Sequence, residues 1–269
     1  MKFIVPDRPL AENLLCFTTT RNGGVSAKPY DSLNLAQHVS DNPISVERNR
    51  QLLSDYLNRS ATQKRSLDGQ INMSSPLMHS KEPAIAPLRF MKQTHSTIAI
   101  DYEQLLESHT NADAVFTKQS RVPLAVLTAD CLPLVLFSNA SNECAAVHAG
   151  WKGLIGGVIE NAVDMFSADN STISAWIGPS ICQHHFEVGS DLAIKFKAYE
   201  SSIVRAADTN KWHIDLSAVA NQILQDLNIV DVQQSRVCTY CRDDLFSFRQ
   251  STHAGLIECG RMATIVMKY

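Results

Sequence analysis

Short apolar runs separated by polar turns dominate the middle of the chain. Residues 124–129, 132–137 and 144–147 are aliphatic runs too short for helices, and their composition predicts buried strands. The same criteria predict further strands at 14–20, 97–100, 173–177 and 263–267, and a short one following Asp113. The pattern therefore places at least one sheet at the centre of the protein.

Helical periodicity appears between these runs. Asn42 and Pro43 form a helix start, with a side-chain cap and a proline at the first position. Val46, Asn49, Leu53 and Leu57 then recur on one side of a helix predicted to end near Asn58. Further helices are predicted over 154–166, over about 190–199, and from a capping Asp215 to residue 227.

Alternating strands and helices without an internal repeat indicate an α+β or mixed α/β fold. Residues 59–89 differ, because serine, proline, glutamine and lysine replace any apolar period. We interpret this segment as a surface insertion rather than a linker, since the elements on both sides look like parts of one fold. The expected organisation is one catalytic domain over residues 1–269.

Composition narrows the class of protein. The 269 residues are 45% hydrophobic and 19% charged, as in a soluble globular protein, and the net charge of -3 without a Lys/Arg cluster argues against nucleic acid as a partner. Pro6 and Asp7 interrupt any signal-peptide core, and no apolar run reaches the roughly 18 residues of a membrane span. Seven scattered cysteines argue against a disulfide framework, so we expect a cytoplasmic protein with no membrane partner.

Polar chemistry occurs where the central apolar runs end. Asp130 and Cys131 lie between the first two runs, and His148 follows the third. Cys131 and His148 are 17 residues apart, a separation that a hairpin-like return of two strands can close. With His95 they would form a His2Cys set, which suits zinc or copper and leaves a fourth coordination position for water or substrate.

The same atoms also suit chemistry without a metal. Cys131 and His148 could form a thiolate and imidazolium pair for nucleophilic attack on an acyl group. Asp130 could orient His148, act as a base, or simply cap a turn. Local sequence leaves these alternatives open.

Three further features are candidates for binding. The turn from Gly150 to Gly153 opens a helix, and its free N–H groups together with Lys152 would suit an anion. Arg21, in a glycine-rich turn, is a second candidate anion contact. Cys238-x-x-Cys241, with Cys259 later, could be half of a zinc ribbon or a redox pair, but no second Cys-x-x-Cys exists, so reduced thiols are favoured.

Several strings resemble the YfiH family of laccase-domain, polyphenol-oxidase-like proteins. They match in order and spacing from near residue 3 to the end, and the combination of TADCLP with HAGWKG is highly specific. The strings are TRNGGVS (20–26), YDSLNLA (30–36), TADCLPLVLF (128–137), AAVHAGWKGL (145–154), WIGPSI (176–181), FEVG and CTY. The resemblance covers almost the whole chain.

The resemblance implies a four-layer α/β/β/α fold with mixed sheets, and a metal, usually zinc with copper as an alternative, on His95, Cys131 and His148. It also implies an enzyme, a purine nucleoside phosphorylase acting on adenosine, inosine, guanosine and methylthioadenosine with adenosine deaminase activity. Alternative activities are a Cys–His amidohydrolase acting on a cell-wall precursor or another amide, and a copper-dependent polyphenol oxidase.

We therefore expect a small-molecule nucleoside and phosphate as partners of a monomer or small homo-oligomer. Cys131, His148, His95 and Asp130 are the expected catalytic residues, with Asp130 assisting only weakly; Arg21, Asn34 and Lys152 are the expected substrate contacts. The family's Gln-x-His-Gly region reads Gln-Thr-His-Ser at 93–96, and residues 249–261 are lengthened. These departures leave the ligand set intact and bear on substrate specificity.

Overall fold

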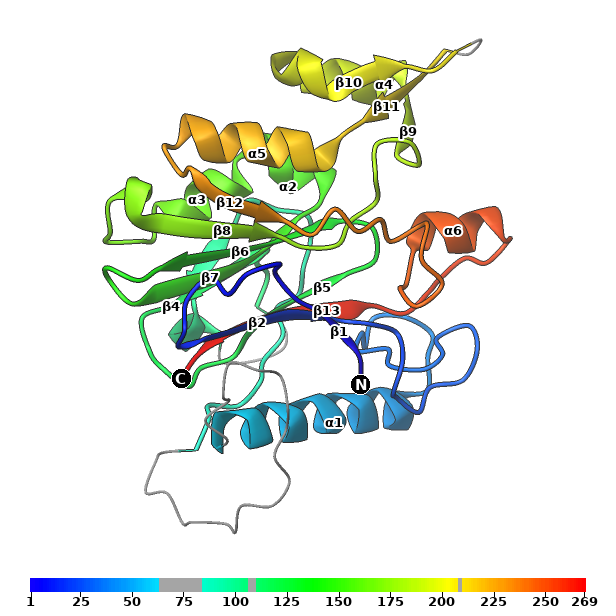
Figure 1. The fold of residues 1–269 in the computed structure, drawn as a ribbon. Coiled ribbons are helices and arrows are strands. Elements are labelled where there is room, and N and C mark those ends of the chain that lie inside the picture. The colour runs from blue at the N-terminus through cyan, green and yellow to red at the C-terminus, as the bar shows by residue number, and fades with distance from the viewer. Residues whose placement is uncertain (63–83, 106–109, 208–209) are drawn as a thin grey trace.

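Four layers build the protein in the computed structural model, which describes residues 1–62, 84–105, 110–207 and 210–269 (Figure 1). Two sheets stack in the middle, and helices cover their outer faces, as expected for an α/β/β/α fold. The six-stranded sheet has the order β12 (Asp231–Gln234), β8 (Ile173–Ile177), β6 (Leu132–Ser138), β7 (Glu143–Ala149), β4 (Ala114–Thr117) and β3 (Ala99–Asp101). The four-stranded sheet has the order β1 (Phe3–Ile4), β2 (Leu14–Thr19), β13 (Met262–Lys268) and β5 (Leu124–Thr128).

Helices lie on both outer faces of this pair of sheets. Above the six-stranded sheet lie α2 (Trp151–Gly156), α3 (Val158–Val163) and α5 (Leu216–Asp226), and α1 (Pro43–Thr62) lies below the four-stranded sheet. A small sheet of β10 (Ile203–Arg205), β11 (Lys211–Ile214) and β9 (Glu187–Gly189) projects beyond α5 together with α4 (Ser190–Ala193). The remaining helices are α6 (Phe248–His253) and the 3-10 turns η1 (Tyr102–Gln104), η2 (Asn170–Thr172) and η3 (Ile194–Ser202).

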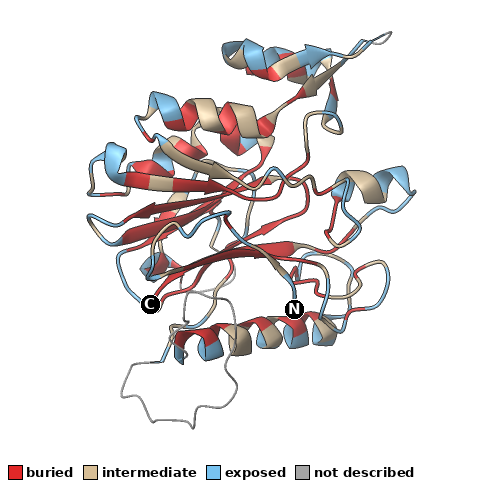
Figure 2. Ribbon diagram, in the orientation of Figure 1, coloured by how far each residue is buried: buried red, intermediate tan, exposed pale blue. Residues whose placement is uncertain are grey.

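Burial on both faces explains why the central strands contain long uninterrupted apolar runs. In β6, Leu134 and Leu136 pack against the helical layer, whereas Val135 and Phe137 pack between the two sheets. Figure 2 shows these strands as continuously buried. Side chains alternate across a strand, so a sheet covered on both sides needs apolar residues in both registers.

Helix α1 is longer than its sequence pattern predicts. Asn42 accepts hydrogen bonds from the backbone of Ile44 and Ser45, which confirms the predicted cap. The predicted end near Asn58 is wrong, because Ala61 continues the buried stripe and the helix ends at Thr62. Most of the predicted insertion, residues 63–83, lies outside the described residues.

Two other predicted helices are interrupted. Gly157, with φ of +104°, separates α2 from α3, so one continuous helix over 154–166 is wrong; only glycine adopts this left-handed conformation at little cost. The segment predicted as a helix over 190–199 is a single turn, α4, followed by η3, in which only Phe196 and Ser202 are buried. Little packing is available there to hold a regular α-helix.

No helix in the described part of the chain has both the length and the apolar character needed to cross a membrane.

Candidate metal centre

Cys131 lies in the connection between the two sheets. The chain leaves β5 in the four-stranded sheet, turns through Asp130 at φ of +86°, and enters β6 in the six-stranded sheet directly after Cys131. Strand β7 returns antiparallel to β6, with Pro133 opposite His148. This pairing confirms the predicted hairpin-like return and brings the thiol and the imidazole to one end of the sheet.

His95 reaches this pair from the loop before β3. Its Nε2 lies 3.6 Å from Sγ of Cys131, and its ring centroid lies 4.9 Å from that of His148, with the rings at 75°. One nitrogen or sulfur ligand atom from each residue lies within 4.8 Å of the other two. A sulfur and a nitrogen on one tetrahedral zinc ion lie about 3.6 Å apart, given ordinary Zn–S and Zn–N bond lengths.

Asp113, immediately before β4, positions both histidines. Its Oδ1 lies 2.7 Å from Nδ1 of His148 and accepts a hydrogen bond from the His95 backbone N–H at 3.0 Å. Its Oδ2 accepts hydrogen bonds from the backbone and hydroxyl of Ser96. A carboxylate on one ring nitrogen fixes the tautomer and leaves the other nitrogen free to bind a metal.

Cys131, His148 and Asp113 each favour the charged form of a neighbour. Burial raises the pKa of the Cys131 thiol, but the positive His148 and hydrogen bonds from His148 and His95 lower it overall, to about 6. Burial lowers the pKa of His148, whereas the Cys131 thiolate and Asp113 raise it overall, to about 9. Burial opposes ionisation of Asp113, yet hydrogen bonds from His148 and Ser96 bring its pKa to about 2. A metal-free site would therefore carry a thiolate and an imidazolium at neutral pH.

The three residues form a site that is open on one side: His148 is buried, Cys131 is half-buried and His95 is exposed. Gly150 approaches closely, since a Cβ there would clash with Cδ2 of His95 and lie 3.2 Å from Sγ of Cys131. Two imidazoles and one thiolate, with access from solvent, fit a zinc ion that retains an exchangeable position. We refer to His95, Cys131 and His148 as the open centre.

Asp130 does not orient His148. Its Oδ1 accepts a hydrogen bond from the Thr239 hydroxyl at 2.6 Å, and its Oδ2 accepts one from the Arg249 backbone N–H at 2.7 Å. Asp130 therefore braces the turn before Cys131, and Asp113 supplies the carboxylate to the imidazole. No residue pattern near Asp113 indicates this role, because it depends on the pairing of β4 with β7.

The three predicted substrate contacts differ in whether their polar side-chain atoms are already hydrogen-bonded within the protein. Arg21 is engaged by Asp31, to which its Nη2 donates at 3.0 Å. Asn34 is fully buried. Its Oδ1 accepts hydrogen bonds from the backbone of Ala36 and Arg261, and its Nδ2 donates to Asp41 and to the Ala36 carbonyl, so its amide group is fully hydrogen-bonded within the protein. Lys152 is exposed on α2 and remains accessible to an anion.

A second convergence of metal-binding side chains lies outside the open centre. Cys182, His185, Cys238 and Cys241 have ligand atoms within 4.8 Å of one another, and we call this group the thiol cluster. Cys259 does not join it, because it is buried with Phe246 and Met262. Sequence reasoning missed the partner of Cys238-x-x-Cys241, although Cys182-x-x-His185 has the same spacing. None of the seven cysteines is joined to another by a disulfide.

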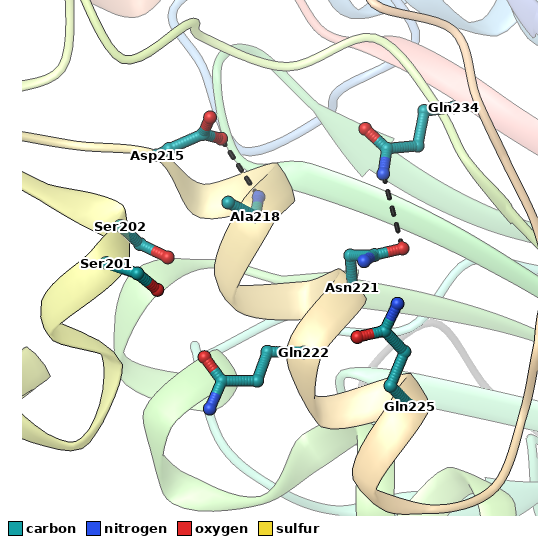
Figure 3. Close-up of a pocket in the computed structure, with 8 residues that line it drawn as sticks. All are labelled: Ser201, Ser202, Asp215, Ala218, Asn221, Gln222, Gln225 and Gln234. Atoms are coloured by element: carbon teal, nitrogen blue, oxygen red, sulfur yellow. Dashed lines mark hydrogen bonds between the residues drawn. The ribbon is translucent and has the colours of Figure 1, made fainter.

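A pocket of about 380 Å³ lies elsewhere, between α5 and the end of η3 (Figure 3). Asp215 caps α5 there by accepting from the Ala218 N–H, and Gln234 donates to Asn221. The other lining residues are Ser201, Ser202, Gln222 and Gln225. None of the predicted catalytic or metal-binding residues lines this pocket.

The fold and the open centre define a class of protein: a mixed α+β protein with an accessible Cys–His centre where two sheets meet. The chain belongs to the family described as multi-copper polyphenol oxidoreductase laccase, the YfiH family, whose model matches residues 15–71 and 70–268. The resemblance seen in the sequence is thereby confirmed.

Relatives extend over the full chain. A Haemophilus influenzae protein named purine nucleoside phosphorylase is 36% identical over 99% of both chains, and the Escherichia coli K12 purine nucleoside phosphorylase YfiH is 32% identical over 98% of both. The crystal structure of the Neisseria meningitidis protein NMB0706 superposes with a TM-score of 0.83 at 31% identity, covering 100% of this chain and 99% of that one. Both the family and the arrangement of its layers are thus shared.

Proposed function

We propose that this protein is a purine nucleoside phosphorylase that also deaminates adenosine and uses a zinc ion bound by His95, Cys131 and His148. The observation that carries this proposal is the open centre itself, a solvent-accessible Cys–His set backed by a buried carboxylate. The full-length relatives named purine nucleoside phosphorylase support the substrate class. The expected substrates are adenosine, inosine, guanosine and methylthioadenosine, together with phosphate.

When bound, zinc at such a set supplies a Lewis acid with one open coordination position. His148 would present Nε2 to the ion, because Asp113 contacts Nδ1. Cys131 supplies a thiolate, which its neighbours already favour at neutral pH. His95 closes the set from the exposed side, where a substrate would enter.

Positive charge beside the open centre supports phosphate as the second substrate. Burial and then the charges of Arg261 and Arg50 lower the pKa of His38, with a smaller effect of His148 in the same direction and an opposing one of Glu258. Arg261, Arg50 and His148 are thus each close enough to His38 to interact with it electrostatically. A phosphate dianion placed there would be stabilised electrostatically, with exposed Lys152 as a further contact.

The test is phosphorolysis by the purified, zinc-loaded protein. We expect inosine and phosphate to yield hypoxanthine and ribose 1-phosphate. Adenosine should yield adenine and ribose 1-phosphate by phosphorolysis, and inosine and ammonia by hydrolytic deamination, as measured by chromatography. His148→Ala should abolish both reactions, whereas His184→Asn, a change to an exposed histidine outside the open centre, should not. A zinc-loaded wild-type protein that leaves both nucleosides intact would exclude the proposal.

One observation favours a second candidate, a cysteine amidohydrolase. Cys131, His148 and Asp113 form a thiolate, imidazolium and carboxylate series with a 2.7 Å contact between the last two. In that mechanism Sγ bonds to the amide carbon, the C–N bond breaks, and His148 donates a proton to the departing amine; water then cleaves the thioester, releasing the acid and regenerating the thiol. Activity that survives chelation and disappears on thiol alkylation would identify it. Phenol oxidation by copper-loaded protein would instead favour the polyphenol oxidase alternative.

A further inference from the structure

The thiol cluster joins two loops that are distant in sequence. Cys182 and His185 lie in the loop between β8 and β9, and Cys238 and Cys241 lie in the loop between β12 and α6. Strands β8 and β12 are parallel neighbours, so both loops leave the same edge of the six-stranded sheet. The cluster therefore crosslinks the continuation of two adjacent strands.

The distances within the thiol cluster match a tetrahedron. Nδ1 of His185 lies 3.2 Å from Sγ of Cys182, 3.5 Å from Sγ of Cys241 and 3.9 Å from Sγ of Cys238. Sulfur and nitrogen ligands of one tetrahedral zinc ion are separated by about 3.6 Å. The three observed separations bracket that value.

Hydrogen bonding alone does not explain this convergence. A neutral imidazole nitrogen carries either one proton or one lone pair, so Nδ1 of His185 can serve only one of the three thiols at a time. An ion at the centre would satisfy all four ligand atoms together. The backbone N–H of Cys182 also points at Sγ of Cys238, 3.3 Å away, as an N–H donor does toward a metal-bound thiolate.

The loop backbone holds the ligands in place. Ser180 forms a parallel bridge with Cys238, and its carbonyl accepts from the Thr239 N–H at 3.1 Å. The ring of His185 stacks on Tyr240 with centroids 4.0 Å apart, while Arg249 donates to the His185 carbonyl at 3.0 Å. Both ring and sulfurs are thus preorganised by contacts that need no metal.

We infer that Cys182, His185, Cys238 and Cys241 bind a second, structural zinc ion. Four protein ligands of the Cys3His type fill a tetrahedron and leave no position for substrate, and paired Cys-x-x-Cys and Cys-x-x-His spacings are typical of such sites. The ligands are half-buried apart from exposed Cys241, so the ion has a path of entry.

This site also braces the open centre. Ile181, next to Cys182, donates its N–H to the Asp130 carbonyl at 3.0 Å, and Thr239, next to Cys238, donates its hydroxyl to the Asp130 carboxylate. Asp130 directly precedes Cys131. A structural ion would therefore stabilise the turn that presents the Cys131 thiol, without touching substrate.

The decisive measurement uses the full chain carrying Cys131→Ser, which disables the open centre. We expect this variant to purify with about one equivalent of zinc, and cobalt exchanged into it to show the intense visible and thiolate charge-transfer absorption of a tetrahedral thiolate site. Adding Cys241→Ser should remove both the ion and the absorption and lower the melting temperature. Adding His184→Asn, which changes the exposed histidine beside His185, should leave both unchanged.

A further variant guards against a simple folding failure. His185→Cys replaces the nitrogen ligand with a fourth sulfur, so it should retain the ion and strengthen the charge-transfer absorption. Cys131→Ser protein with no bound zinc and no cobalt spectrum would overturn the inference. A disulfide between Cys182 and Cys238, found by mass spectrometry of protein purified without reductant, would also overturn it in favour of a redox pair. Neither result depends on nucleoside cleavage, so this inference can fail independently of the proposed function.

Discussion

The open centre and the thiol cluster use similar side chains in different ways. The open centre has three ligands, two of them histidines, and extends from buried His148 to exposed His95. The thiol cluster has four ligands, three of them cysteines, on two loops tied together by backbone hydrogen bonds. A three-ligand set leaves room for a reacting molecule, and a four-ligand set does not.

The residue that contacts the histidine also differs between the two groups. Behind the open centre, the buried carboxylate of Asp113 contacts His148, which fixes the ring and adds negative charge. His185 in the thiol cluster has an aromatic partner instead, Tyr240. The comparison teaches that the number of converging ligand atoms and the orienting partner distinguish the two groups more than the presence of cysteine and histidine does.

The largest expected effect is a difference in phosphorolysis activity between a variant of the open centre and a variant of the thiol cluster. Cys131→Ser should lower kcat/KM for inosine phosphorolysis by on the order of 1,000-fold, because metal-ion stabilisation contributes several kcal/mol. Cys241→Ser should lower it far less and should mainly reduce the melting temperature. Steady-state kinetics and thermal unfolding of both variants provide the check, and equal losses of activity would contradict the division.

Gly150→Ala tests the close packing of the open centre. The new Cβ would clash with the His95 ring, displacing a ligand, and we expect a loss of activity on the order of 100-fold. Gly255→Ala is the matched control; Gly255 has φ of +79° and no atom within 4 Å of the added Cβ. That control should lose about 1 kcal/mol of stability and keep its kcat/KM. Unchanged activity in Gly150→Ala would refute the predicted displacement.

Asp113→Asn and Asp130→Asn together test which carboxylate orients the His148 ring. Asp113→Asn should weaken metal binding or activity by roughly 10- to 100-fold, the usual effect of losing a carboxylate behind a metal-binding histidine. Asp130→Asn should have a smaller effect, since Asp130 contacts Thr239 and Arg249 instead of the imidazole. Metal titration of the open centre, with melting temperatures as the folding control, distinguishes them; a reversed order would restore Asp130 as the orienting residue.

The smallest expected effect is a difference in the rate of Cys131 alkylation between wild type and His148→Ala. In metal-free protein, Cys131 should react with an apparent pKa near 6, whereas partial desolvation and a hydrogen bond with Cys238 raise the pKa of Cys241 to about 11. His148→Ala should shift the Cys131 midpoint toward about 8.5 while changing its rate at pH 7 only about two- to threefold, because a more basic thiolate is less abundant but more nucleophilic.

The signs of these shifts also define a stability window for metal-free protein. The lowered pKa of Cys131 makes its contribution to stability disappear as pH falls through about 6, and the raised pKa of His148 makes its contribution disappear as pH rises through about 9. Denaturant unfolding across that pH range measures the change in the free energy of unfolding. For the alkylation experiment, mass spectrometry identifies which thiol has reacted. An alkylation midpoint for Cys131 that is the same in wild type and His148→Ala would contradict the ion pair.

Local pattern was sufficient for the central strands and for a mixed α/β or α+β class of fold, whereas the four layers followed from the resemblance to a family. The apolar runs that become β5, β6 and β7 are continuous because both faces of each strand are covered, so residues pointing to either face are mostly apolar. Periodicity also located α1 and α5. It failed at Gly157 and beyond Ser190, where one glycine and a thinly packed segment broke the expected helices.

By itself, the sequence indicated that Cys131 and His148 lie at strand ends and that His95 could join them as a ligand set, which the resemblance to a family supported. Only the tertiary structure decided that Asp113 rather than Asp130 faces His148, and that Cys182 and His185 meet Cys238 and Cys241. The physical reason is that periodicity records whether each residue is buried locally, whereas the partner of a polar side chain depends on which strands pair and which loops leave the same edge of a sheet.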